Sequence, residues 1–193
     1  MTDLARQEGV FLESESKVIK NMLTFKDIEA KDIMTPRTVM KTEDETVTIK
    51  DFFDKNLNLR FSRIPIYSND PDDIIGLVLK DEVFKEMALD NGDKTLADIK
   101  RNILVVSRNM AIPKLFENLV ESKNHMALVV DEYGTVSGLV TMEDVIETLL
   151  GFEIMDESDT EQDMRAAARR LWQERARKLG VEAEVAEQIK RSG

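Results

Sequence analysis

The sequence of 193 residues contains no cysteine, one histidine and one tryptophan. Without cysteine the chain forms neither disulfide bonds nor thiolate metal sites, which agrees with a reducing compartment. A single histidine also excludes the histidine pairs that hold metal ions in many hydrolases. Two catalytic signatures are missing as well, the G-x-S-x-G motif and the P-loop G-x-x-x-x-G-K-[ST]. These absences leave little support for an enzyme such as a nucleotide phosphohydrolase.

Long apolar runs and excess positive charge are also missing. The longest clean apolar run, Ile74–Leu79, is far too short to span a bilayer, and no secretory signal is visible at Met1. The formal net charge is −11, and the body of the chain has no basic stripe interleaved with aromatic residues. Nucleic acid is therefore not expected as a partner. A content of 42% hydrophobic and 34% charged residues is ordinary for a soluble globular protein.

The most informative stretch that is present is a buried strand that turns into an amphipathic helix. The segment Gly138–Leu150 starts with an apolar run and continues with apolar residues at helical spacing. Thr141 stands at the N-cap position with Asp144 three residues later, which resembles a capping box. A helix N-terminus with a hydroxyl and a carboxylate beside it also suits a phosphate and a ribose. This stretch alone leaves both interpretations open.

The chain contains a second copy of this pattern. A shift of 62 residues lays Gly76–Val83 on Gly138–Val145 without a gap. The same shift lays Arg63–Tyr67 on His125–Val129, and further upstream it becomes 63. Each unit reads as helix, strand, polar turn, strand and helix, preceded by a short extended segment. This internal repeat predicts one module with two similar halves.

The apolar spacing and the turn residues predict the individual elements. Extended segments are expected at 39–40 and 104–106, strands at Arg63–Tyr67, Ile74–Leu79, Met126–Val130 and Val136–Val140, and helices at 49–57, Glu82–Leu89, Pro113–Val120 and Met142–Leu150. Pro65 inside the first strand predicts an edge position or a bulge, because proline has no N–H for the ladder.

Both flanks predict helices. An apolar face from Val18 to Leu23 follows an acidic first turn that begins at Glu13, and this face must pack on something. After an acidic stretch, the alanine- and arginine-rich segment Met164–Leu179 has only a narrow apolar stripe. We expect this helix to pack lightly against a partner subunit or a domain outside this sequence, with membrane-surface attachment as the alternative.

Two acidic clusters raise the question of cation binding. They are Asp70, Asp72 and Asp73 in a turn, and Asp156, Glu157 and Asp159 in the tail. A solvated turn and a solvated tail are the favoured interpretation, so no metal site is expected.

Several segments together resemble a pair of CBS domains, a Bateman module, and more narrowly the CorC/CNNM family of membrane proteins linked to magnesium and cobalt transport. The segments that carry the resemblance are Asp32–Arg37, Ser62–Tyr67, His125–Gly134, Gly138–Glu147 and Glu153–Asp159. The resemblance covers about 28–159 and implies an α+β fold of two pseudo-symmetric β-α-β-β-α repeats with flanking N- and C-terminal helices. The expected division is a connector helix at 1–27, repeats at 28–94 and 95–152, and an acidic segment with a basic helix at 153–193.

The resemblance also implies a ligand, an adenine nucleotide, either AMP or ATP with Mg²⁺, in the cleft between the two units. Thr141 and Asp144 match the residues that hold ribose and phosphate. Ser62 and Arg63 match a segment that faces the same cleft, where Arg63 is suited to pair with a phosphate. The candidates for the adenine wall are Val39, Met40 and Pro65.

The pseudo-equivalent second cleft lacks this pattern. Leu79 replaces the threonine, Glu82 occupies the aspartate position, and His125 is expected to replace the arginine. The resemblance therefore implies one nucleotide per chain. A strand-edge position favours a structural role for His125 over general-base chemistry.

In this family a membrane-embedded domain precedes the module, so the chain is expected to be part of a longer protein at the cytoplasmic side of the cell membrane. The leading hypothesis is a regulatory module in a homodimer whose geometry changes with nucleotide occupancy and controls a divalent-cation transporter. The alternative is a structural dimerisation scaffold with no bound nucleotide. An enzyme is the third and least supported possibility.

Overall fold

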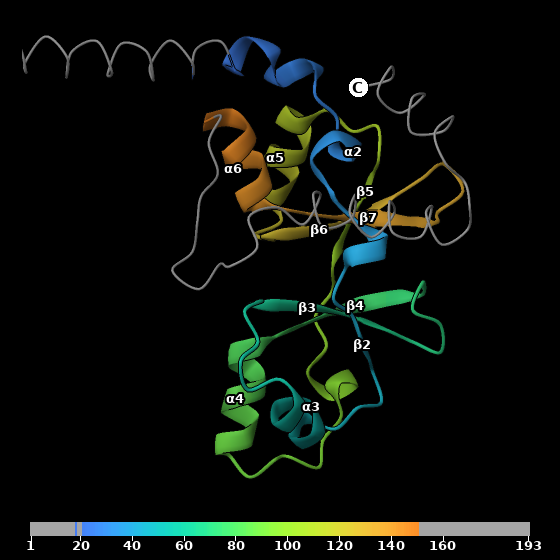
Figure 1. The fold of residues 1–193 in the computed structure, drawn as a ribbon, viewed down its shortest axis with the longest axis vertical. Coiled ribbons are helices and arrows are strands. Elements are labelled where there is room, and N and C mark those ends of the chain that lie inside the picture. The colour runs from blue at the N-terminus through green and yellow to red at the C-terminus, as the bar shows by residue number, and fades with distance from the viewer. Residues whose placement is uncertain (1–17, 19–20, 151–193) are drawn as a thin grey trace, which may run out of the picture.

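The computed structural model describes residue 18 and residues 21–150. Two β-sheets lie face to face across the middle of this part of the chain, and helices cover their two outer faces (Figure 1). The first unit contains β2 (Glu43–Asp44), α3 (Ile49–Lys55), β3 (Arg63–Tyr67), β4 (Ile74–Leu79) and α4 (Lys80–Ala88). The second contains β5 (Leu104–Ser107), α5 (Ile112–Glu121), β6 (Met126–Val130), β7 (Val136–Thr141) and α6 (Met142–Leu150).

Short elements connect and precede the two units. They are η1 (Phe25–Asp27), α2 (Ala30–Ile33), β1 (Thr35–Pro36), η2 (Arg37–Val39) and η3 (Leu96–Ile99). The first sheet has the strand order β2-β3-β4, and the second has the order β1-β7-β6-β5. In both sheets a parallel pair is followed by an antiparallel hairpin, β2-β3-β4 in one and β5-β6-β7 in the other. The α+β class and the two-fold repetition expected from the sequence are confirmed.

Each sheet has its own helical core on its outer face. In the first unit Phe52 of α3 and Val83 of α4 pack on Ile64, Ile66 and Val78 of the sheet. In the second unit the corresponding cluster joins residues of α5 and α6 to the outer face of β6 and β7, and its members are Leu115, Leu119, Val145, Ala127, Val129 and Val140. A third, smaller cluster of Leu77, Met126 and Leu139 lies between the sheets.

The segments that precede the units are exchanged between them. Ala30 and Ile33 of α2, which come before the first unit in sequence, are buried in the core of the second. The Ala30 N–H donates to the Met110 carbonyl at 2.9 Å, and β1 pairs with β7. In return, Leu96 of η3 is buried in the core of the first unit. The division at 94 and 95 stays a prediction, and each core contains residues from both sides of it.

Two glycines make the exchange possible. A Cβ atom added to Gly138 would collide with the Thr35 carbonyl of β1, and one added to Gly76 would lie 2.5 Å from the Arg101 carbonyl. Arg101 and Leu77 form an isolated antiparallel bridge that corresponds to the pairing of Thr35 with Leu139. Both glycines are therefore required because a connecting backbone crosses directly over the strand.

The predicted extended segment is wrong for Val39, which ends the 3-10 helix η2. Met40, the C-cap of that helix, has an extended backbone but belongs to no strand. The strand that corresponds to β5 is β2, which pairs in parallel with Ile66 and Tyr67. Glu43 and Asp44 carry no apolar signal, so a pattern search for strands passes over them.

The prediction for Pro65 is partly confirmed. Strand β3 lies between two neighbours rather than at an edge. However, β2 reaches only Ile66 and Tyr67, so it leaves Pro65 without a partner on that side. The register between β3 and β4 shifts at Ile66 and Tyr67, which is the predicted bulge, one residue after the proline.

The predicted register of the repeat is wrong by one residue in β3. Arg63 pairs with Leu79, and Met126 pairs with Thr141, so Arg63 corresponds to Met126. The Ser62 carbonyl accepts from the N–H of the first residue of α4, as the His125 carbonyl does from α6. His125 therefore occupies the position of Ser62 and does not replace the arginine. The extra residue lies in the β3–β4 turn, where surface chain tolerates an insertion.

The helix predictions at the two flanks fall mostly outside the described residues. Residues 21–24 are helical, and the Met22 and Leu23 side chains, expected to pack, are 55% and 68% exposed. The segment Met164–Leu179 and the acidic tail lie outside the described residues. Within residues 18 and 21–150, no helix has the length and apolar character needed to cross a bilayer.

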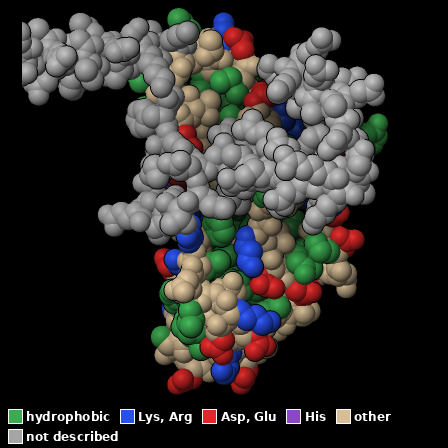
Figure 2. Space-filling model, viewed as in Figure 1, with side chains coloured by type: hydrophobic (Ala, Val, Ile, Leu, Met, Phe, Trp, Pro, Cys, Tyr) green, Lys and Arg blue, Asp and Glu red, His purple; other side chains and the backbone are tan. Residues whose placement is uncertain are grey.

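Charges of both signs are mixed on the surface of the first unit. Figure 2 shows Lys and Arg side chains interspersed with Asp and Glu over its described residues. Lys50 and Asp54 form one such ion pair on α3 at 3.0 Å, and Lys94 and Glu86 form another at 2.8 Å. This visible face therefore presents no large field of a single sign.

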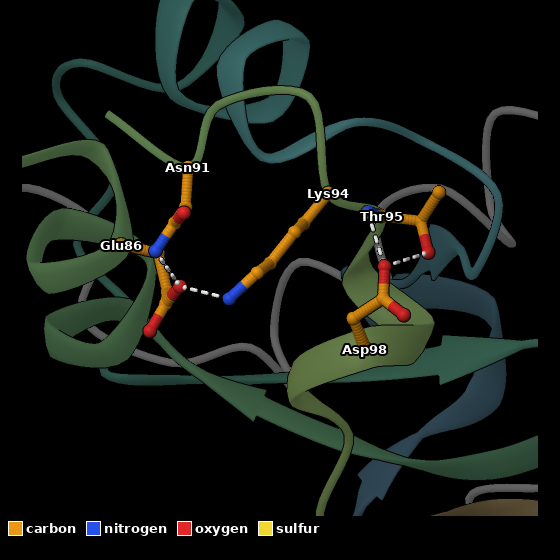
Figure 3. Close-up of polar contacts among 5 residues, drawn as sticks. All are labelled: Glu86, Asn91, Lys94, Thr95 and Asp98. Atoms are coloured by element: carbon orange, nitrogen blue, oxygen red, sulfur yellow. Dashed lines mark hydrogen bonds and ion pairs between the residues drawn. The ribbon is translucent and has the colours of Figure 1, made fainter. Parts of the chain in front are cut away.

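A cluster of polar contacts fixes the loop between α4 and η3 (Figure 3). Glu86 accepts from Lys94 and Asn91, each at 2.8 Å, and Asp98 accepts from the Thr95 N–H at 2.8 Å and from its hydroxyl at 3.0 Å. The hydrogen bond from Lys94 lowers the pKa of Glu86 below its usual value. The bonds from Thr95, the backbone one foremost, lower the pKa of Asp98. Both carboxylates therefore favour folding when ionised.

This cluster predicts a loss of stability in acid. A carboxyl whose pKa is lowered in the folded state contributes stability above its unfolded pKa and loses it as the pH falls through the folded value, so the free energy of unfolding should drop between about pH 5 and about pH 2. Urea titrations of Asp98→Asn should show a shallower drop than the parent protein. An unaltered slope in Asp98→Asn would contradict the assignment.

Candidate functional site

The strongest candidate pair, Thr141 and Asp144, lies where β7 passes directly into α6. The Asp144 Oδ2 atom accepts from the Thr141 N–H at 2.7 Å and from the Thr141 hydroxyl at 2.8 Å. The Thr141 hydroxyl oxygen in turn accepts from the Asp144 N–H at 3.2 Å. This is the reciprocal geometry of a capping box, so the capping interpretation is confirmed. The helix N-terminus also fixes both side chains in place.

The next turn of α6 strengthens this arrangement. The Thr148 hydroxyl donates to the Asp144 carbonyl at 2.7 Å, and Val145 is buried in the core beneath. Both Thr141 and Asp144 are half-buried, with no flexible loop between the strand and the helix. The pair therefore presents a hydroxyl and a carboxylate in a preorganised position beside positive backbone dipole.

Strand alternation places the Thr141 side chain on the inner face of the second sheet. Val140 belongs to the outer helical core, whereas Leu139 belongs to the cluster between the sheets. Because alternate residues of a strand point to opposite faces, Thr141 shares the inner face with Leu139. Its cross-strand partner, Met126, also belongs to the cluster between the sheets.

The same reasoning places Arg63 and Pro65 on the inner face of the first sheet. Pro65 lies opposite Leu77, which belongs to the cluster between the sheets, and Arg63 lies opposite Leu79, which packs against that cluster. Directly opposed residues of an antiparallel pair share a face. Pro65 is buried and Arg63 half-buried. Arg63 and Thr141 thus flank one apolar cluster from opposite sheets.

The remaining candidates lie around this cluster. Met40 packs against it, and η2, which ends at Val39, packs against β7. Ser62 is exposed immediately before β3. Within residues 18 and 21–150, Arg63 forms no ion pair, which leaves its guanidinium available to an anion. The structure thus brings the candidates to the facing surfaces of the two sheets, with direct bonding between Thr141 and Asp144.

The acidic turn between β3 and β4 is held by its own contacts. The Asp70 Oδ1 atom accepts from the Asp72 N–H at 2.9 Å, and Asp72 forms an ion pair with Arg37 of η2 at 2.8 Å. The carboxylates of Asp70 and Asp72 thus stabilise the turn and attach it to η2, which agrees with the structural interpretation of this cluster. In the described part of the chain, no group of three or more acidic or histidine side chains is arranged to hold a metal ion. The tail cluster at 156–159 lies outside the described residues.

One contact beside the site was missed from the sequence. Arg101 donates to both carboxylate oxygens of Glu82, from Nε at 2.9 Å and from Nη2 at 3.3 Å. Glu82 lies in α4 and Arg101 in the connector between η3 and β5, and neither has a sequence pattern that points to the other. The sequence analysis singled out Glu82 only because it corresponds to Asp144, and it did not single out Arg101.

Comparisons with known proteins agree with this architecture. A CBS domain model matches residues 96–151. A UPF0053 protein of Synechocystis sp. is 32% identical over 181 residues, which is 94% of this chain and 52% of that protein. The magnesium and cobalt efflux protein CorC of Escherichia coli is 31% identical over 172 residues, which is 88% of this chain and 59% of CorC. The chain thus spans a little over half the length of these two relatives.

Solved structures extend the comparison to the fold. The CBS domain of a bacterial CNNM/CorC family Mg²⁺ transporter superposes with a TM-score of 0.71 at 33% identity, over 79% of this chain and 92% of that one. The CBS domain of a bacterial CNNM/CorC family Mg²⁺ transporter in complex with ATP gives a TM-score of 0.68 at 34% identity, over 72% of this chain and 99% of that one. These matches, at more than 30% identity and over nearly all of each solved chain, lead to one assignment. This chain belongs to the CBS-domain modules of the CNNM/CorC family.

Proposed function

We propose that this chain is a regulatory module that binds one adenine nucleotide between its two sheets and controls a membrane transporter of divalent cations. The observation that carries the proposal is the Thr141–Asp144 pair, fixed at a helix N-terminus and facing Arg63 across one apolar cluster. A carboxylate suits ribose hydroxyls, and a guanidinium suits phosphate. The complex of a solved relative with ATP supports the ligand class.

The candidate residues divide into three roles in this proposal. Asp144 accepts from the ribose hydroxyls, and Thr141, beside the positive end of the α6 dipole, approaches a phosphate. Ser62 and Arg63 bind the phosphates from the other sheet. Val39, Met40 and Pro65 provide an apolar wall for adenine. With a formal net charge of −11, a triphosphate needs Mg²⁺ as well as Arg63 to offset repulsion.

We further propose that two modules form a homodimer at the cytoplasmic side of the cell membrane, attached to a membrane-embedded transport domain of the full-length protein. Nucleotide binding would control transport only by favouring one geometry of that dimer over another. The relationship to CorC supports the transport context. The alternative is a dimerisation scaffold that holds no nucleotide.

Calorimetric titration with AMP and with ATP, each with and without Mg²⁺, tests the proposal. We expect one nucleotide per chain, and affinity reduced at least tenfold, about 1.4 kcal/mol, in Thr141→Ile and in Arg63→Ala. The AMP and ATP arms identify the ligand, and dependence on Mg²⁺ shows whether the metal accompanies it.

Matched controls separate the site from general loss of structure. Thr95 and Asp98 form a second capping box outside the facing sheets, so Thr95→Ile removes the same kind of cap and should leave nucleotide affinity unchanged. Lys114→Ala removes a cation from the outer helix α5 and controls for Arg63→Ala. If a folded dimer bound no nucleotide at millimolar concentration, the scaffold alternative would replace the regulatory one.

A further inference from the structure

The pseudo-symmetric counterpart of the proposed site is built differently. Leu79 ends β4 opposite Arg63 in the same way as Thr141 ends β7 opposite Met126. Three residues further on, Glu82 therefore corresponds to Asp144. Leu79 has no hydroxyl, and α4 begins without a side-chain hydrogen bond from its N-cap residue. The Glu82 carboxylate is thus free of the capping role that holds Asp144.

The Glu82 carboxylate instead forms an ion pair with Arg101. Its Nε and Nη2 atoms donate to the two different oxygens of Glu82, which is a bidentate contact. The Glu82 side chain is 27% exposed and that of Arg101 is 56% exposed. The pair neutralises the negative charge and uses both oxygens that would otherwise accept ligand hydroxyls.

The backbone of Arg101 is also fixed over the strand. The Arg101 N–H donates to the Leu77 carbonyl at 2.8 Å, and the Leu77 N–H donates to the Arg101 carbonyl at 3.0 Å. Arg101 therefore occupies the connector position that Thr35 occupies over Leu139 in the second unit. The two connectors cross their strands alike, but only one carries a guanidinium beside the carboxylate.

We propose that Arg101 closes the pseudo-symmetric site to nucleotide and so limits the module to one ligand. This inference rests on the proposed function. An exposed ion pair contributes only about 0–1 kcal/mol, so its strength alone does not exclude a ligand. The exclusion comes from position, because two hydrogen bonds hold the main chain of Arg101 over β4, and from there its guanidinium reaches both oxygens of the carboxylate that ribose would need.

Restoring the second site in steps tests the inference. All variants are made in a Thr141→Ile background, in which any remaining nucleotide binding reports the second site. Adding Leu79→Thr and Glu82→Asp recreates the threonine-x-x-aspartate pattern with Arg101 still present, and we expect no binding. Adding Arg101→Thr, which copies Thr35, should give one nucleotide per chain by calorimetry.

Two results would overturn the inference. Binding before Arg101 is changed would show that the side chains at 79 and 82 alone close the site. No binding after it is changed, in a variant whose urea midpoint matches that of its background, would show that other positions such as Met126 set the limit. As control, Lys94→Thr in place of Arg101→Thr removes a different connector ion pair to α4 and should create no site. Failure of the proposed function is distinguishable, because the parent protein would then bind no nucleotide.

Discussion

Replacement of Gly138 by alanine should lower the free energy of unfolding by about 3 kcal/mol or more, which is the upper range for overpacking. The added Cβ would collide with the carbonyl oxygen of Thr35, with Met34 Sδ 3.1 Å away. A side chain could rotate away from such a collision, but a backbone carbonyl paired in a sheet must move with its strand. Strand β1 would therefore separate from β7. Urea unfolding monitored by circular dichroism measures the change.

Gly134→Ala is the matched control for this prediction. Gly134 has φ of +82°, and no atom lies within 4 Å of an added Cβ. Its replacement adds only the cost of the left-handed conformation, about 1–2 kcal/mol. If Gly138→Ala were no more destabilising than Gly134→Ala, the close crossing of β1 over β7 would be incorrect.

Replacement of Phe52 by alanine should cost about 3–5 kcal/mol, because Phe52 is 1% exposed at the centre of the first core. We also expect both units to unfold together, since the second core contains α2, which precedes the first unit, and the first core contains η3, which precedes the second unit. Amide NMR signals of Ile66 and Val129 report the two sheets separately during urea titration. Their midpoints should fall by the same amount.

Phe84→Ala provides the comparison for Phe52. Phe84 is 39% exposed and stacks edge-to-face on Phe53 with ring centroids 5.4 Å apart. Its removal takes away part of an aromatic contact and should cost about 1 kcal/mol. A shift of the Ile66 signal alone in Phe52→Ala would show that the units unfold independently and would contradict the expected coupling.

The long strands and helices were predictable because each has a local signature. Apolar runs mark β3, β4 and β6 at their observed bounds, and Pro113 marks the first turn of α5. Strand β2 was not predictable, because two acidic residues form it through pairing with β3. The predicted register of the repeat was wrong for a related reason. The Ser68 N–H bonds to the Asp73 carbonyl, whereas the Asp131 N–H bonds to the Thr135 carbonyl, so the turns differ by one residue.

The candidate site shows the same division between local and distant signals. Thr141 and Asp144 are three residues apart, so the helix start alone brings them together. Arg63 and Thr141 flank one cluster from opposite sheets because of how the sheets pack. Only the resemblance to a family predicted that they share one cleft. The bond between Glu82 and Arg101 spans 19 residues and follows from the crossing of a connector over β4. No short-range pattern encodes such a crossing.

The exchanged connectors also bear on why the repeat occurs as a pair. In a single copy of the unit, the preceding connector would lack the strand of the other unit that it crosses. The unit's own strand, at Gly76 or Gly138, would in turn lack the connector that covers it. Its exposed sheet edge and unfilled core would then favour capture of the same piece from another molecule. Duplication within one chain supplies the missing connector at a fixed effective concentration. It also limits the exchange of connectors to two units. The covalent pair therefore provides within one chain the contacts that a single copy would have to obtain from a second molecule.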